Sequence, residues 1–186
     1  MELGYVYSME RITFDSLRKE FPEVSLDYLK LVLSAYENNK SFIIKNSTES
    51  HAKLLTYLLL NRSKESVKLF VEKIKNTFYE DDLIVNTLKN LNKEIKIKVI
   101  LEKDSSGKIR ELTNVEMFIA TDDMIKKLHG VEINNFLVVD SCAFRYEENH
   151  SSPKESVSAS VSFNDKHMSS SLDNLFQIIQ KNSKII

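Results

Sequence analysis

The stretch INNFLVVDSCAFRYE, residues 133–147, carries the clearest structural signal in this sequence. Its run from Phe136 to Val139 is wholly apolar and ends at Asp140, as expected of a strand that is buried on both faces. The Ser-Cys pair that follows can form a tight turn, and residues 143–147 fit a returning strand. The sequence therefore predicts a β-hairpin near residues 136–147.

Helix-length and strand-length segments alternate before this hairpin. Apolar residues at steps of three and four predict helices at about 9–21, 25–38, 51–61, 81–91 and 121–128. Short apolar or alternating runs predict strands at 41–45, 67–71, 95–101 and 115–120. Strands separated by helix-length segments favour parallel pairing, so this part of the chain indicates an α/β layer fold.

The chain after the hairpin predicts one further strand and a C-terminal helix. In residues 157–163, VSASVSF, serine alternates with apolar side chains, which is typical of a strand with one solvated face. Asn164 or Asp165 can cap the helix that follows. The expected buried face of that helix is Met168, Leu172, Leu175, Phe176 and Ile179. These elements and the hairpin together predict a mixed sheet flanked by helices.

The composition is that of a folded domain. The chain has 186 residues, of which 42% are hydrophobic and 28% charged, with only 3 Gly and 2 Pro. This mixture excludes collagen-like and wholly disordered proteins. A single cysteine, Cys142, excludes an internal disulfide and a thiolate zinc cluster built from this chain alone. No apolar run approaches the roughly 18 residues of a membrane span, and no secretory signal opens the sequence, so we expect a cytoplasmic protein.

Charge is unevenly distributed along the chain. The net charge is −1 overall, but residues 41–110 contain 14 Lys or Arg against 9 Asp or Glu, a local charge of +5. Such a segment can be the footprint of a polyanion. However, 12 of its 14 basic residues are lysines spread singly, which favours an ordinary solvated surface.

The hairpin and the order of elements resemble one half of the phospholipase D-like superfamily. That family carries the motif H-x-K-x4-D at the start of a core strand, and commonly G-S-x-N on the next strand. The spacing places the family's His at Ile133, its Lys at Asn135 and its Asp at Asp140. The serine-bearing segment falls on residues 144–147, which contain no Gly-Ser. The resemblance covers residues 25–186 and leaves 1–24 as an N-terminal helical extension.

The resemblance implies a degenerate active site. The family's enzymes attack a phosphodiester with the histidine and neutralise developing charge with the lysine. Ile133 can do neither, and Asn135 carries no charge. The resemblance thus implies a pseudoenzyme, a non-catalytic interaction or scaffold subunit of a bacterial-type multi-protein complex. Because the family pairs two halves, a single half implies a partner, either a second copy in a homodimer or another protein.

Two other functions remain open at this point. The first is a nucleic-acid-binding module that keeps phosphodiester affinity without cleavage. The second is a hydrolase with a site outside the family motif, which would use His129, Asp140 or Glu147. Arg145 is a further candidate site residue. His129 is also explained as a polar residue in the turn after a helix, and Asp140 as a hairpin-turn residue. The sequence has no glycine-rich phosphate loop and no zinc motif, and it predicts neither a cofactor nor a metal site.

Overall fold

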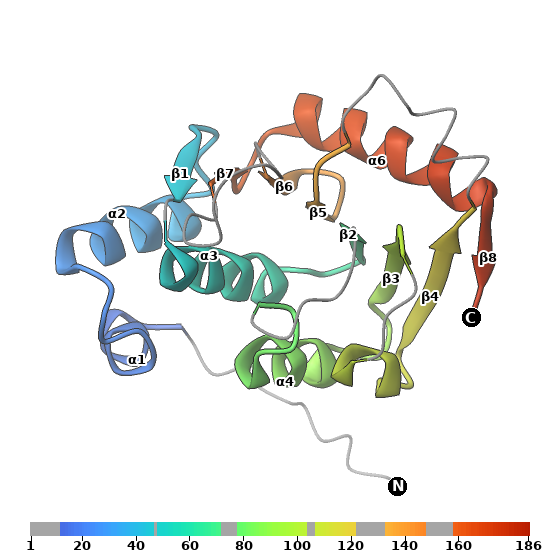
Figure 1. Ribbon diagram of the computed structural model, residues 1–186. Helices are drawn as coiled ribbons and strands as arrows, with labels where there is room; N and C mark the ends of the chain where they lie inside the picture. Colours follow the sequence, from blue (N-terminus) through green and yellow to red (C-terminus); the bar gives the residue numbers. More distant parts are fainter. Residues whose placement is uncertain (1–11, 47, 72–77, 104–106, 122–132, 148–157) are drawn as a thin grey trace, which may run out of the picture.

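A mixed sheet forms the middle layer of the molecule and has helices on both faces (Figure 1). The computed structural model describes residues 12–46, 48–71, 78–103, 107–121, 133–147 and 158–186. The helices are α1 (Phe14–Glu20), α2 (Leu26–Glu37), α3 (Glu49–Asn61), α4 (Asp82–Asn90), the 3₁₀ turn η1 (Lys108–Glu111) and α6 (Lys166–Lys181). The strands are β1 (Ile44–Asn46), β2 (Ser66–Val71), β3 (Lys96–Leu101), β4 (Val115–Ala120), β5 (Phe136–Val139), β6 (Ala143–Glu147), β7 (Ala159–Ser162) and β8 (Ser183–Ile185).

The strands are ordered β1-β7-β6-β5-β2-β3-β4-β8 across the sheet. The pairs β2–β3 and β3–β4 are parallel, and the remaining pairs are antiparallel. A helix between the two strands predicts only the first of these parallel pairs, because the 3₁₀ turn η1 connects β3 to β4. The predicted hairpin is present as β5 and β6, with Phe136 opposite Tyr146 and Val139 opposite Ala143. Asp140 and Ser141, with φ angles of 51° and 49°, form its left-handed turn. The mixed α/β sheet predicted from the sequence is therefore confirmed.

Two cores lie on the two faces of the sheet. The larger core packs α1 to α4 against alternate strand residues such as Val67, Val99 and Leu137. The smaller core packs α6 against residues of the opposite parity, including Phe70 and Phe136. Figure 1 shows this separation, with α3 and α4 on one side of the strands and α6 on the other. The direction in which a strand side chain points therefore decides which helical layer it meets.

Side-chain caps fix where the five described α-helices begin, and Thr13 caps α1. Ser25 caps α2, and Thr48 accepts from the backbone N–H of His51 at the start of α3 at 3.2 Å. Asp81 accepts from Leu83 at the start of α4, and Asp165 caps α6 as the sequence predicts. In the described part of the chain, no helix combines the length and the apolar character that crossing a membrane requires.

Some predicted element boundaries are wrong. Residues 41–43 are not part of a strand, since β1 pairs with β7 only from Ile44 onward, and Phe42 and Ile43 are 43% and 44% exposed. Helix α3 begins two residues earlier than predicted because Thr48 is its cap. The short elements η1 and β8 were not predicted. The helix predicted over 121–128 lies almost wholly outside the described residues.

Candidate functional site

Three side chains at or beside the predicted motif positions form a hydrogen-bonded cluster, which we call the Asn135–Arg145–Glu147 cluster. The Asn135 amide donates to Glu147 Oε2 at 2.7 Å, and Arg145 Nη1 donates to Glu147 Oε1 at 2.7 Å. The backbone N–H of Glu147 also donates to the Asn135 carbonyl at 2.9 Å. The alternation of β5 and β6 explains the grouping, because these three residues share the sheet face that meets α1 to α4. Each carboxylate oxygen of Glu147 therefore already accepts a hydrogen bond inside the protein.

Arg145 is the most deeply buried charged residue of the cluster. Its side chain is 0% exposed, and its guanidinium carbon lies 5.0 Å from the centre of the Phe78 ring. Burial raises the pKa of the neighbouring Tyr79 phenol, and the positive charge of Arg145 opposes this only in part. Within the described residues, Arg145 Nε and Nη2 have no hydrogen-bond partner. The Glu147 carboxylate thus supplies the negative charge that a buried guanidinium requires.

Ile133 and Asn135, the positions at which the motif's His and Lys were expected, do not face each other. Ile133 is half-buried and packs against the core on the α6 side of the sheet. Asn135 faces the opposite side, with Arg145 and Glu147. The structure therefore brings together three of the predicted site residues, Asn135, Arg145 and Glu147, and leaves Ile133 outside their cluster.

Asp140 lies at the other end of β5 and has a structural environment. Its carboxylate accepts from three successive backbone N–H groups, those of Lys64 at 2.9 Å, Glu65 at 2.9 Å and Ser66 at 2.8 Å. Its own N–H donates to the Ser66 carbonyl at 3.0 Å. Five residues of extended chain separate it from Asn135, a distance of about 17 Å at strand geometry. Asp140 therefore fastens the segment before β2 to the hairpin turn.

The other candidates do not add to the cluster. His129 lies outside the described residues. Cys142 sits at the hairpin turn, where burial raises the pKa of its thiol, with Arg62 among the charges that oppose the shift. A raised thiol pKa disfavours the nucleophilic thiolate. Within the described residues, no group of three or more His, Cys, Asp or Glu side chains could hold a metal ion.

No protein-family model matches this sequence, and no curated protein matches it significantly. Solved structures do resemble it. The phospholipase D family member Nuc from Salmonella typhimurium superimposes with a TM-score of 0.60 at 12% identity, over 79% of this chain and 99% of Nuc. NucT from Helicobacter pylori gives a TM-score of 0.59 at 10% identity, over 79% of this chain and 100% of NucT.

A third structure covers more of this chain. TrmBL2, an archaeal chromatin protein whose structure shows a novel mode of DNA binding, aligns with 92% of this chain and 66% of its own at a TM-score of 0.55 and 11% identity. At these identities the likeness shows the fold and nothing finer. It agrees with the element order and with the hairpin that the sequence predicts. The chain therefore has the phospholipase D-like α/β fold.

Proposed function

We propose that this chain is a non-catalytic phospholipase D-like subunit that acts in the cytoplasm by binding a partner, either a second copy of itself or another protein. The observation that carries the proposal is the Asn135–Arg145–Glu147 cluster. Its Glu147 carboxylate accepts from both Asn135 and Arg145, and its one buried cation is paired with that carboxylate at 2.7 Å. A side-chain arrangement of this kind stabilises the hairpin and offers no nucleophile.

The chemistry of diester cleavage explains why the cluster favours this proposal. Covalent attack on phosphorus needs a nucleophile held at the phosphorus, and the oxygens need positive charge as the transition state forms. Ile133 offers neither. The pair Arg145–Glu147 has no net charge, and the Glu147 carboxylate would repel a phosphodiester. The residues at these positions therefore suit a folded interaction module better than a hydrolase.

The test combines an activity assay with a measurement of mass. The purified full chain is incubated with bis(p-nitrophenyl) phosphate and with a labelled oligonucleotide, and its mass is measured by light scattering over a range of concentrations. We expect no hydrolysis, together with a homodimer or a stoichiometric complex with a protein partner. Hydrolysis that Glu147→Gln or Asn135→Ala abolishes would overturn the proposal. Hydrolysis that only His129→Ala abolishes would support a hydrolase with a site outside the family motif.

Nucleic-acid binding is the second candidate function. It is favoured by the likeness to the DNA-binding protein TrmBL2, which extends over 92% of this chain, and by the charge of +5 in residues 41–110. Electrostatic binding of this kind weakens steeply with salt. Fluorescence anisotropy of a labelled duplex with micromolar protein tests it, and an unchanged signal at low salt would exclude it.

A further inference from the structure

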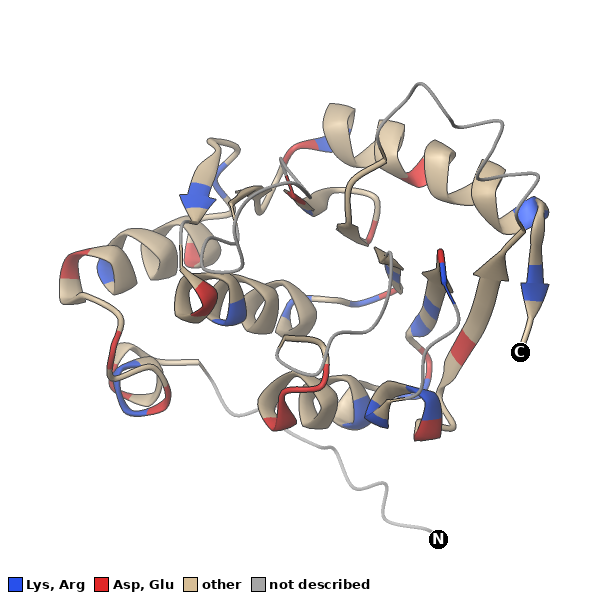
Figure 2. Ribbon diagram, in the orientation of Figure 1, with Lys and Arg blue, Asp and Glu red and all other residues tan. Residues whose placement is uncertain are grey.

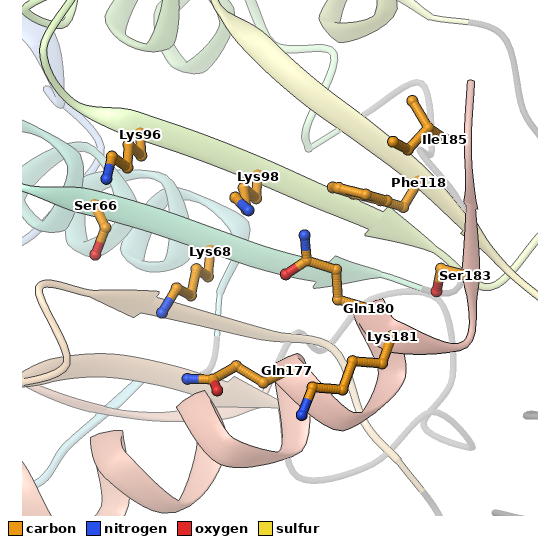
Figure 3. A pocket seen from close by; sticks show the side chains of 10 residues that line it. All are labelled: Ser66, Lys68, Lys96, Lys98, Phe118, Gln177, Gln180, Lys181, Ser183 and Ile185. Carbon is orange, nitrogen blue, oxygen red and sulfur yellow. The ribbon is translucent and has the colours of Figure 1, made fainter.

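A groove of about 630 Å³ lies between α6 and the strands β2, β3, β4 and β8 (Figure 3). Four lysines line it: Lys68 on β2, Lys96 and Lys98 on β3, and Lys181 at the end of α6. Among the residues that the structure describes, these are the only ionisable side chains in its lining. The whole chain has nearly equal numbers of basic and acidic residues, 26 and 27. The charge composition of the groove lining, which has lysines and no acidic residue, differs from that of the whole chain.

Strand alternation gathers these lysines on one face. Lys68 and Lys98 lie side by side in the register of β2 and β3, on the face that meets α6. Like charges on neighbouring strands cost stability when their side chains are adjacent. Figure 2 shows blue segments on β3 and at the end of α6, which both border the groove. The repulsion between Lys68 and Lys98 is offset, because Lys68 is paired with Asp173 and Lys98 with Glu116.

Two of the four lysines are already paired. Lys68 forms an ion pair with Asp173, and Lys98 lies 3.1 Å from Glu116 and above the ring of Phe118. Lys96 and Lys181 are exposed and form no ion pair within the described part of the chain. The groove therefore has two unneutralised cations, one on each wall.

We infer that this groove binds a phosphate-bearing ligand through Lys96 and Lys181. Lysine is a common point-charge partner of phosphate. Figure 3 shows Lys96 and Lys181 at opposite ends of the lining, so an extended anion that lies along the groove would meet both ammonium groups. Gln180 extends from α6 into the groove and can add an amide donor, whereas Gln177 already donates to Asp173 at 3.2 Å (Figure 3). The Phe118 ring is only 4% exposed, so it forms part of the floor and offers no stacking platform. The ligand is thus recognised by its phosphate charge rather than by a stacked base.

This inference goes beyond the proposed function because it concerns another surface. The groove lies on the α6 face of the sheet, whereas Asn135 and its partners face α1 to α4. An apolar ligand would have to displace water from the lysines, which is unfavourable. A metal cation would find no carboxylate in the lining, and the nearby Asp173 and Glu116 are already paired with Lys68 and Lys98. Phosphate is the chemistry that the lining accommodates.

The test is calorimetric titration of the full chain with inorganic tripolyphosphate at low salt. The double variant Lys96→Gln/Lys181→Gln removes both exposed cations and is expected to weaken binding roughly tenfold or more. The matched control Lys30→Gln/Lys40→Gln makes the same charge change at exposed lysines of α2 and of the residues after it, and should leave the affinity unchanged. Circular dichroism checks that both variants remain folded. Equal losses in the two variants, or no binding to the wild type, would overturn the inference.

A second arm distinguishes the source of the phosphate. A labelled single-stranded oligonucleotide is titrated at several salt concentrations with the wild type and the double variant. If the ligand is a phosphodiester strand, losing two contacts should reduce the slope of log K against log salt by roughly 1.4. Binding of tripolyphosphate without the oligonucleotide would assign the groove to a small phosphorylated molecule. Oligonucleotide binding that the double variant leaves intact, without tripolyphosphate binding, would exclude the groove while leaving nucleic-acid binding as a function of the chain.

Discussion

At the scale of single residues, the contacts of Asp140 serve the fold. Its carboxylate accepts three backbone hydrogen bonds at 2.8–2.9 Å, and its φ of 51° lies in the left-handed region that Asp and Asn tolerate. Asp140→Ala removes the acceptor and adds backbone strain, so we expect the free energy of unfolding to fall by roughly 2–3 kcal/mol. Asp140→Asn keeps the turn and one acceptor oxygen and should cost only about 1 kcal/mol. Urea denaturation measures both, and equal losses would contradict this role.

Arg145 and Glu147 form a buried ion pair in which each charge is compensated by the other. The Arg145 side chain is 0% exposed and that of Glu147 is 15% exposed. Removing one partner leaves the other charge unpaired, so Arg145→Met or Glu147→Gln alone should lower the free energy of unfolding by about 3–5 kcal/mol. The double variant leaves no unpaired charge and should be clearly more stable than the sum of the two losses predicts. Additive losses in a double-mutant cycle would show that the pair is not coupled.

At the scale of elements, the contact between α2 and α3 makes stability depend on pH. His51 of α3 stacks on Tyr28 of α2 with ring centres 3.8 Å apart, and burial lowers the pKa of His51 from its usual 6.5. The unfolded chain therefore takes up a proton more readily than the folded one, and the contribution of His51 to stability is lost as pH falls from about 6.5 through the lower pKa of the folded state. His51→Phe keeps a stacked ring without this titration, so its melting temperature should fall less than that of the wild type between pH 7.5 and pH 5.5. Parallel profiles would contradict the assignment.

The elements that the sequence predicts well are those whose pattern is local. Strand β5 has four apolar residues in succession, and the α6 cap at Asp165 is visible from one residue. The strand predicted at residues 41–43 is wrong because three apolar or small residues in a row also suit an exposed connection. Only the pairing with β7 distinguishes a strand from such a connection. Strand β8, Ser183–Ile185, depends wholly on the edge of β4 and has no signal of its own. Tertiary pairing therefore decides the elements that local propensity leaves open.

At the scale of the whole molecule, the sites follow from register, which the sequence does not reveal. The Asn135–Arg145–Glu147 cluster needs the β5–β6 pairing, and the motif spacing alone placed Ile133 beside Asn135 when they face opposite layers. The groove lined by the four lysines depends on the parallel register of β2 and β3. It also depends on α6, which starts 95 residues after the end of β2. From the sequence the lysines of residues 41–110, Lys68, Lys96 and Lys98 among them, favoured a solvated surface, because their gathering with Lys181 is visible only in the assembled sheet.

The two ends of the sheet limit how the molecule can associate. Both edge strands, β1 and β8, are three residues long and have lysine at the centre, Lys45 and Lys184. Short edges with a central lysine oppose the addition of a further strand from another molecule. The residues that follow Lys184 are two exposed isoleucines, Ile185 at 72% and Ile186 at 44%, so the lysine is the main barrier to association at that edge.

We therefore expect Lys184→Val to promote association of the sheet edges. The change turns the C-terminal strand into a continuous β-branched run with unpaired backbone groups on its outer side, and such an edge recruits strands from other molecules. Light scattering should show larger species than the wild type forms, increasing with concentration, while Lys40→Val, an equal change outside the sheet, should not. Any homodimer of the wild type uses another surface, so its mass should persist as the smallest species of the variant. A Lys184→Val variant with the same mass distribution as the wild type would show that the lysine does not protect this edge.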